Sequence, residues 1–258
     1  MDIGLNGKRV VVTAGAQGIG LAITGAFVAA GAQVHICDVN DDFLAAAKKK
    51  FPQVSQSHTD VSNERQVDAM FAELATRWGA LDVLVNNAGI AGPTARVEDT
   101  ELVDWQQTIA VNLTGPFLCT RRAVPLLKAA GGGSIVNLSS IAGRLGFPLR
   151  TPYSASKFGV VGLTETWAME LGPSKIRVNA ILPGIVEGER QERVIAAKAA
   201  LYDIKHEEMR ERLLAKVSLR SMVTAQDIAH QIIFICSPAG AMISGQCLSV
   251  CGNVEHLG

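Results

Sequence analysis

Short apolar runs alternate with helix-like stretches along the whole chain, and this alternation limits the fold more than any other feature. The apolar runs predict strands at residues 8–15, 33–40, 54–61, 81–89, 134–140, 176–184 and 245–252. Helical patterns separate these runs. One of them ends at residue 50, and the others occupy residues 20–31, 64–78, 97–130, 153–171, 187–216 and 225–236. Strands separated by helices pair in parallel, and a parallel sheet needs helices on both faces. The sequence therefore predicts an α/β fold with a doubly wound parallel sheet.

The chain has the size and composition of one domain. Its 258 residues, 48% of them hydrophobic, are enough to bury one large core. Since no repeat and no Pro/Gly/Ser-rich linker divides the sequence, we predict a single domain over residues 1–258. Residues 187–216 are richer in charge than the rest, and we expect them to form a helical flap that covers the substrate. The helical stretch 97–130 has a predicted interruption at Gly115-Pro116.

The net charge, the length of the apolar runs and the spacing of the histidines argue against several classes of protein. The 24 basic residues balance the 24 acidic ones, so bulk charge favours neither a nucleic-acid partner nor an anionic membrane surface. No apolar run reaches the roughly 18 residues of a membrane span, and the N-terminus lacks the apolar centre of a signal peptide. We expect a cytoplasmic protein with no membrane partner. The five histidines are widely spaced and predict no metal site.

A glycine-rich turn follows the first predicted strand. Residues 13–20 are TAGAQGIG and place Gly15, Gly18 and Gly20 between a strand and a helix. Glycines let the backbone approach a ligand closely, and the N–H groups of the following helix attract a pyrophosphate. A tight turn without a ligand would also explain three glycines taken alone.

An acidic residue ends the second predicted strand, about twenty residues beyond this turn. Asp38 can accept hydrogen bonds from the ribose hydroxyls of an adenosine and would repel a 2′-phosphate. Gln17 and Cys37 are uncharged, so neither offers a partner to that phosphate. The combination favours NAD over NADP, although Asp38 alone could be a solvated carboxylate at a strand end.

Residues 150–159, RTPYSASKFG, place Tyr153 and Lys157 four positions apart on a predicted helix, and therefore on one face. A free tyrosine has a pKa of about 10, too high for a base at neutral pH, but a nearby ammonium favours the phenolate. The alternative is an exposed pair that only packs. Ser140 ends the strand at 134–140, at the sheet edge where ligands collect, and a hydroxyl there could donate to a substrate oxygen. Spacing alone leaves Ser139 equally placed.

Together and in this order, these motifs resemble the short-chain dehydrogenase/reductase family over essentially the whole chain. Further matching pieces are Asp60-Val61, NNAG at 86–89, Asn112 in VNLTG, and Pro183-Gly184. The resemblance implies a Rossmann-type fold and a catalytic set of Asn112, Ser140, Tyr153 and Lys157. In that set the tyrosine is the acid/base, the lysine lowers its pKa and holds the nicotinamide ribose, the serine polarises the substrate oxygen, and the asparagine supports a proton relay. The family's serine lies thirteen positions before the tyrosine, which selects Ser140.

The resemblance also implies the contacts to NAD. They are Gly15, Gln17, Gly18, Ile19, Gly20, Asp38, Asp60, Val61, Asn87, Ala88, Gly89, Tyr153, Lys157, Pro183, Gly184 and Val186. The chain departs from the family at two places. Ala14 stands where the family has its first glycine, and Gly188 stands where it has a threonine that touches the nicotinamide amide. We expect backbone groups of Ile185 and Val186 to replace that threonine.

The implied reaction is NAD-dependent hydride transfer between a secondary alcohol and a ketone. Arg144, Arg150, Glu187 and Arg190 lie in the segments that line the substrate pocket in the family, and arginines suit carboxylates. We therefore predict a small polar substrate such as a sugar, sugar acid or hydroxy acid, although these arginines could instead be solvent-facing. The alternatives are a 3-oxoacyl thioester (acyl carrier protein) reductase, which would prefer NADPH, and a non-catalytic cofactor-binding protein. The apolar helices at 105–130 and 153–171 resemble those through which the family forms oligomers, so we expect a homodimer or homotetramer.

Overall fold

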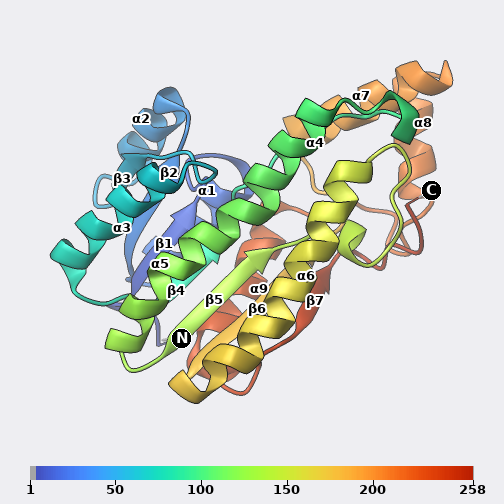
Figure 1. The fold of residues 1–258 in the computed structure, drawn as a ribbon. Coiled ribbons are helices and arrows are strands. Elements are labelled where there is room, and N and C mark those ends of the chain that lie inside the picture. Colours follow the sequence, from blue (N-terminus) through green and yellow to red (C-terminus); the bar gives the residue numbers. More distant parts are fainter. Residues whose placement is uncertain (1–3, 258) are drawn as a thin grey trace.

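The computed structural model describes residues 4–257, apart from the side chain of Arg190. It contains one sheet of seven parallel strands in the order β3-β2-β1-β4-β5-β6-β7 (Figure 1). The strands are β1 (Arg9–Thr13), β2 (Gln33–Asp38), β3 (Ser55–His58), β4 (Val83–Asn86), β5 (Gly133–Leu138), β6 (Ile176–Pro183) and β7 (Cys247–Val250). The strand order reverses between β1 and β4, and ligands of open parallel sheets bind in the crevice at such a reversal.

Helices cover both faces of this sheet, which confirms the predicted single-domain doubly wound fold. They are α1 (Gly18–Ala29), α2 (Asp41–Lys50), α3 (Glu64–Trp78), α4 (Leu102–Ile109), α5 (Gly115–Ala129), α6 (Thr151–Leu171), α7 (Glu189–Tyr202), α8 (His206–Leu214) and α9 (Ala225–Cys236). Successive side chains of a strand point to opposite faces. Val10 and Val12 of β1 therefore pack in the core formed with α1, α2 and α9, whereas Val11 packs in the core formed with α3, α5 and α6.

The predicted interruption of the helix at Gly115-Pro116 takes a different form. Residues Ala110–Thr114 form a π-helical turn between α4 and α5, and helical geometry continues through Gly115. Pro116 lies in the first turn of α5, where its missing N–H costs little. The irregular turn contains Asn112, and π-turns of this kind frequently occur at functional sites.

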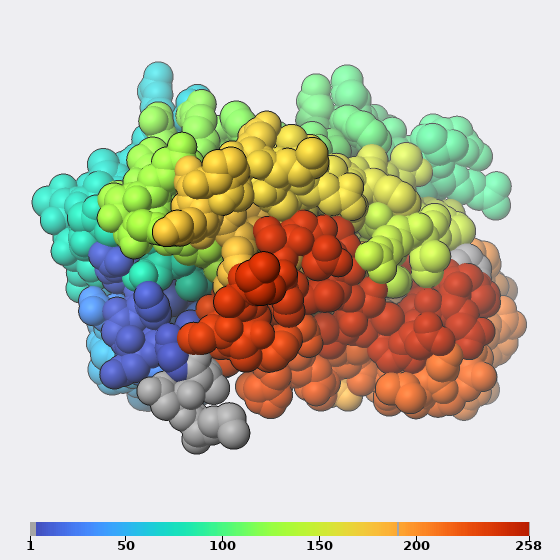
Figure 2. Space-filling model, turned by 90° about the horizontal axis from the view of Figure 1, so that it is seen from below, coloured from blue at the N-terminus to red at the C-terminus, as the bar shows by residue number. Residues whose placement is uncertain are grey.

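The segment predicted as a flap contains α7 and α8, which lie at the end of the molecule toward which the β5 arrow points (Figure 1). Glu192 of α7 accepts a hydrogen bond of 2.6 Å from Arg210 and lies 3.1 Å from Nε2 of His206, both on α8. Figure 2 shows the C-terminal residues, in red, beside the orange flap segment. Backbone hydrogen bonds from Glu255 to Lys216 (2.9 Å) and from Ser218 to Asn253 (3.0 Å) join the two. The base of the flap is thus fixed to the C-terminal tail.

Within residues 4–257, no helix combines the length and the apolar character that crossing a membrane requires.

Candidate active site

A cavity of about 1020 Å³ opens at the carboxyl ends of the central strands. It is bounded by the glycine turn after β1, the loop after β4, the start of α6, and the flap. Fourteen of the residues predicted for the site line it: Gln17, Gly18, Ile19, Gly20, Asn87, Gly89, Ser140, Arg150, Tyr153, Lys157, Pro183, Gly184, Val186 and Glu187. The cavity lining does not include Gly15, Asp38, Asp60, Val61, Ala88, Asn112 or Arg144.

The glycine turn is shaped to hold a ligand against the start of α1. Gly18 has a φ of +52°, and a Cβ on it would meet open space. A Cβ on Gly20 would lie 2.0 Å from the carbonyl oxygen of Ala14, so the chain can pass there only without a side chain. The side chain of Gln17, the N-cap residue of α1, makes no capping hydrogen bond to the helix, which leaves the first N–H groups of α1 available to a pyrophosphate.

Thr13, at the end of β1, joins this turn to the loop after β4. Its hydroxyl oxygen accepts hydrogen bonds from the backbone N–H groups of Asn87 and Ala88, both at 3.0 Å. The amide of Asn87 donates to the carbonyl oxygens of Thr13 (2.9 Å) and Ala14 (3.1 Å). The sequence analysis placed Thr13 in the turn without a role of its own. A hydroxyl at the carboxyl end of the first strand was the available signal.

Asp38 ends β2 with one of its carboxylate oxygens unsatisfied. Its Oδ1 accepts the backbone N–H groups of Val39 (2.9 Å) and Asn40 (3.2 Å). Its Oδ2 is buried and has no hydrogen-bond partner among residues 4–257. A buried acceptor without a donor is costly, and the two hydroxyls of a ribose would supply the missing donor. The residues therefore fit the adenosine half of a dinucleotide.

Asp60 and Val61 follow β3, the neighbour of β2 in the sheet. The Oδ1 of Asp60 accepts hydrogen bonds from the backbone N–H (2.8 Å) and the hydroxyl (2.7 Å) of Ser62. Val61 is buried against Gly115 of α5, where a Cβ would lie 2.8 Å from the valine side chain. The pair thus lies at the same sheet edge as Asp38 but outside the cavity lining.

The two serines at the end of β5 have different environments. The hydroxyl of Ser139 donates to the carbonyl oxygen of Lys157 at 2.8 Å. The hydroxyl oxygen of Ser140 accepts the backbone N–H of Ala142 at 3.2 Å, which leaves its own O–H to donate into the cavity. Both serines line the cavity, but only the Ser140 O–H is left without a bond to the backbone, and its role toward a substrate stays a prediction.

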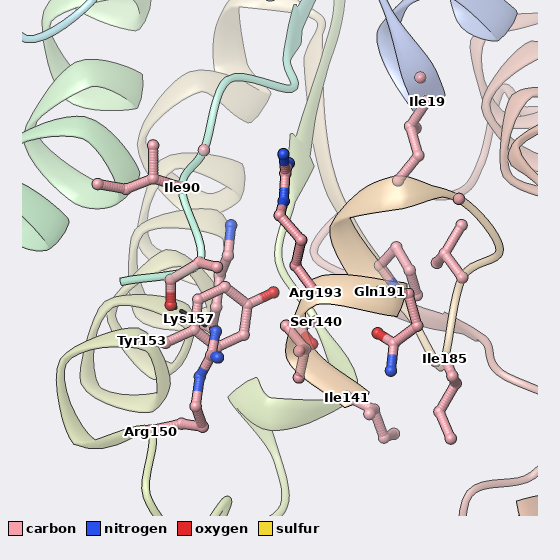
Figure 3. A pocket seen from close by; sticks show the side chains of 18 of the residues that line it. Ile19, Ile90, Ser140, Ile141, Arg150, Tyr153, Lys157, Ile185, Gln191 and Arg193 are labelled. Carbon is pink, nitrogen blue, oxygen red and sulfur yellow. Dashed lines mark hydrogen bonds between the residues drawn. The ribbon is translucent and has the colours of Figure 1, made fainter. Parts of the chain in front are cut away.

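Tyr153 and Lys157 lie in the first two turns of α6, behind Pro152, whose ring fits the first turn of a helix. The Lys157 ammonium is buried, donates to the carbonyl oxygen of Leu138 at 2.8 Å, and lies 5.6 Å from the centroid of the Tyr153 ring. Figure 3 shows the Tyr153 hydroxyl directed into the cavity on the side of Ser140. A phenol, an ammonium and a hydroxyl thus converge on one wall.

Asn112 is fully buried beneath this wall. Its Oδ1 accepts the backbone N–H of Ile90 at 2.7 Å, and its amide donates to the Ile90 carbonyl oxygen (3.0 Å) and to Ser156 Oγ (3.2 Å). A Cβ on Gly89 would lie 3.3 Å from Asn112 Oδ1 and 3.5 Å from Lys157 Nζ. Asn112 Oδ1 and Lys157 Nζ therefore both lie beside Gly89, which lines the cavity.

The four residues predicted for the substrate are placed differently. Arg150 is buried, and its guanidinium carbon lies 5.3 Å from the Tyr153 ring centroid, while one Nη donates to Thr94 at 2.9 Å. Glu187 also lines the cavity. Arg144 is exposed and donates to the carbonyl oxygen of Cys247 at 2.8 Å, away from the cavity lining. The side chain of Arg190 lies outside what the structure describes.

Four charged residues that line the cavity were not among the predicted site residues: Glu189, Arg193, Lys198 and Lys216. Lys198 of α7 lines it with only 5% of its surface exposed. Burial, and then the positive charges of Lys216 and Arg150, lower its pKa to about 8. In the sequence Lys198 is one cation in a charged segment, and only its helical register relative to Gln191 and Val194 could have indicated that it faces inward.

Residues 4–257 contain no group of three or more His, Cys, Asp and Glu side chains arranged to hold a metal ion.

Comparisons with known proteins find reductases and dehydrogenases. The family model described as Enoyl-(Acyl carrier protein) reductase matches residues 13–253. The chain is 35% identical over 254 residues to the 3-oxoacyl-[acyl-carrier-protein] reductase of Thermotoga maritima, covering 97% of this chain and 98% of that protein. It is 36% identical over 256 residues to the trans-4-hydroxycyclohexanecarboxylate dehydrogenase of Sinomonas cyclohexanicum, with 95% and 92% covered. It is 41% identical over 191 residues to a short chain dehydrogenase/reductase of Colletotrichum higginsianum, with 72% and 71% covered.

Two solved structures share the fold closely. The structure of an NAD⁺-bound xylitol dehydrogenase matches with a TM-score of 0.92 and 28% identity, covering 96% of this chain and 99% of that one. A variant actinorhodin polyketide ketoreductase with NADPH matches with a TM-score of 0.92 and 30% identity, covering 96% and 97%.

Proposed function

The chain belongs to the short-chain dehydrogenase/reductase family, and on this premise we propose that it is an NAD-dependent oxidoreductase interconverting a secondary alcohol and a ketone. One observation carries the proposal. Ser140, Tyr153 and Lys157 lie on one wall of a cavity whose other wall is a glycine turn at a helix N-terminus. A proton-transfer set and a pyrophosphate cradle in one cavity support hydride transfer coupled to proton transfer.

Each residue of the set has a separate task. The Ser140 O–H donates to the reacting oxygen of the substrate and fixes its position. The Tyr153 hydroxyl gives a proton to that oxygen in reduction and takes it back in oxidation. The Lys157 ammonium stabilises the phenolate form of Tyr153 and also binds the nicotinamide ribose. When bound, the nicotinamide cofactor supplies or accepts the hydride. Asn112 holds the loop at Ile90 and passes protons toward Lys157 through water.

We propose NAD as the cofactor because of Asp38. The matched structures contain NAD⁺ in one case and NADPH in the other, so family membership alone does not select one. The buried Oδ2 of Asp38 can accept from ribose hydroxyls, whereas a 2′-phosphate would place like charges together. The predicted substitute for the missing threonine is supported by Val186, which lines the cavity. The backbone is held on both sides of Val186. The Val223 N–H donates to the Ile185 carbonyl oxygen at 2.8 Å, and the Glu187 N–H donates to the Val223 carbonyl oxygen at 2.9 Å.

For the substrate we propose a small polar or anionic alcohol, such as a hydroxy acid or sugar acid. Arg150 beside Tyr153 supports this choice, and one relative acts on a hydroxy acid by its name. The second candidate is reduction of a 3-oxoacyl thioester, which the Thermotoga maritima relative supports. That candidate calls for NADPH and is therefore disfavoured by Asp38.

We further propose that the protein assembles as a homodimer or homotetramer in the cytoplasm. Phe117 of α5 and Phe158 of α6 expose 43% and 46% of their surfaces, which supports an apolar contact on the helices predicted for it. Light scattering coupled to size-exclusion chromatography would measure the number of subunits.

A substrate screen tests the proposed reaction. The purified protein would be assayed with NAD and with NADP against sugars, sugar acids, hydroxy acids and secondary alcohols, and in reverse with 3-oxoacyl thioesters. Turnover of hydroxy acids or sugar acids with NAD is expected. Turnover restricted to thioesters with NADPH would support the second candidate instead.

A further inference from the structure

Lys198 is a buried cation inside the cavity, and the helical register of α7 accounts for its position. Gln191, Val194 and Lys198 are spaced by three and four residues, so they share one helical face, and all three line the cavity. The Lys198 ammonium lies 4.4 Å from the centroid of the Phe147 ring. The same ring lies 5.7 Å from the Arg150 guanidinium, which in turn contacts Tyr153. Lys198 is thus separated from the reacting hydroxyl by Phe147 and Arg150.

The surroundings of this ammonium are positive. Among the residues that the structure describes, no carboxylate lies within ion-pair distance of Lys198. Burial is the main reason why the pKa of Lys198 is lowered to about 8, and the positive charges of Lys216 and Arg150 add to this shift. A buried ammonium without an anion is costly. An anion that enters the cavity would relieve this cost, and Lys198 still carries its proton at neutral pH.

A second cavity of about 470 Å³ adjoins the first at Lys198. The two share Lys198, Lys216 and His256 among their lining residues. Four basic residues line the second cavity: Lys198, Lys216, His256 and Arg212. Tyr202 is the other ionisable residue among those that line it. We call this second cavity the basic lobe. Arg212 is ion-paired with Glu208 at 2.6 Å, so the positive charge that makes the flap end of the substrate cavity attractive to anions comes mainly from Lys198 and Lys216.

From these contacts we propose that Lys198 binds a carboxylate of the substrate, at the end of the molecule remote from the carbon that exchanges hydride. The proposal rests on the proposed function and narrows its substrate class to hydroxy acids and their oxo acids. The carbinol or carbonyl end lies at Ser140 and Tyr153, and the carboxylate lies beyond Phe147, at the mouth of the basic lobe. One compact ammonium matches one carboxylate, and the aromatic ring beside it holds the lysine in place.

Paired substrates provide the test. The wild type would be assayed with NAD on 3-hydroxybutyrate, 4-hydroxycyclohexanecarboxylate and gluconate, each against its primary amide. We expect acid to be preferred over amide by about tenfold or more in kcat/KM for at least one pair, as charged hydrogen bonds provide. Lys198→Met should reduce this preference about 10- to 100-fold, mainly through KM, and Lys198→Arg should restore part of it. Lys205→Met, an exposed lysine of the same flap, should keep the wild-type preference.

The pH dependence gives a second reading of the same site. Free Lys198 loses its proton as pH rises through about 8, so KM for the acid should rise above that pH in the wild type. The other charged or titratable side chains that line the two cavities are Arg150, Tyr153, Lys157, Glu187, Glu189, Arg193, Tyr202, Arg212, Lys216 and His256. The rise belongs to Lys198 only if Lys198→Met removes it, and a rise that persists in this variant contradicts the proposal.

Binding without turnover separates this proposal from the proposed function. Calorimetry would titrate the same carboxylates into wild type, Lys198→Met and Tyr153→Phe, each with NAD present. If the protein binds carboxylates only when Lys198 is present but turns over no alcohol, the proposed function is wrong and the Lys198 site is retained. Alcohol oxidation with no acid preference, or an unchanged preference in Lys198→Met, would overturn the site alone. Dependence on Lys198 only for thioesters carrying a pantetheine phosphate would also overturn the assignment of a carboxylate.

Discussion

The Ser139 hydroxyl donates a hydrogen bond of 2.8 Å to the backbone oxygen of Lys157, at the point where β5 ends against α6. The side chain of the same lysine donates to the carbonyl oxygen of Leu138 at 2.8 Å. One residue of α6 is therefore attached to β5 through both its main chain and its side chain. This double attachment sets the position of the Lys157 ammonium relative to Tyr153, and the neighbouring Ser140 lines the cavity.

The two serines should therefore respond differently to substitution by alanine. Ser140→Ala removes the proposed donor to the reacting oxygen and should lower kcat about 10²- to 10³-fold. It also removes the acceptor for the Ala142 N–H, so we expect a loss of about 1 kcal/mol of unfolding free energy. Ser139→Ala removes a buried structural hydrogen bond and should cost about 1–2 kcal/mol of unfolding free energy, with a much smaller loss of kcat. Steady-state kinetics and urea unfolding would measure both. Equal losses of kcat in the two variants would contradict the assignment.

Asp38 should control the choice of cofactor. Asp38→Ala removes the acceptor for the ribose hydroxyls and the repulsion of a 2′-phosphate. The kcat/KM for NAD should fall about tenfold or more, as for a lost charged hydrogen bond, and the ratio of NADP to NAD activity should rise. Asp42→Ala, an exposed carboxylate in the following helix, serves as the control. A wild type that already prefers NADP would show that Asp38 does not act this way.

Ala14 is strained, and glycine should relieve the strain. Its φ of +47° lies in the left-handed region, which costs a residue with a Cβ about 1–2 kcal/mol. Part of this is offset by the greater chain entropy of glycine. Ala14→Gly should therefore raise the unfolding free energy by about 0.5–1 kcal/mol, or Tm by about 1–4 °C. A decrease in Tm, measured by calorimetry, would contradict this reading of the turn.

Lys198 should make stability depend on pH in a predictable direction. Its folded pKa of about 8 is below its ordinary value, so between these two pH values the unfolded chain binds more protons than the folded one. Unfolding free energy therefore rises with pH through that window. Lys198→Met lacks this rise. Its stability advantage over the wild type should shrink between pH 7.5 and pH 9.5 in urea unfolding, and an advantage that stays constant would contradict the lowered pKa.

The order of strands and helices could be predicted from the sequence because its signals are local. Val10, Val11 and Val12 form a continuous apolar run, as a strand buried on both faces requires. The glycines after it, and the four-residue spacing of Tyr153 and Lys157, depend only on neighbours in sequence. The family resemblance then supplied Ser140, whose separation from Ser139 depends on a contact with α6 that spacing cannot express.

Features that depend on tertiary packing could not be predicted from the sequence. The π-turn at Ala110–Thr114 follows from how α4 and α5 fit the core and the Ile90 loop, and no residue type signals it. Arg144 was predicted to line the substrate pocket, whereas Lys198 was not singled out from the charged segment that contains it. The structure places Arg144 on the surface, bonded to Cys247, and Lys198 inside the cavity. The adjoining face of α7 carries Ile195 and Ala199, which pack in an apolar cluster with residues of α8 and of the C-terminal tail.

The activity of Tyr153→Phe tests the central claim most directly. This change removes only the hydroxyl that we propose exchanges a proton with the substrate, and it keeps the ring that packs beside Lys157 and Arg150. The account predicts that kcat falls about 10²- to 10⁴-fold for whichever alcohol the wild type oxidises, while calorimetry still detects NADH binding. A Tyr153→Phe protein that retains wild-type kcat would contradict the account.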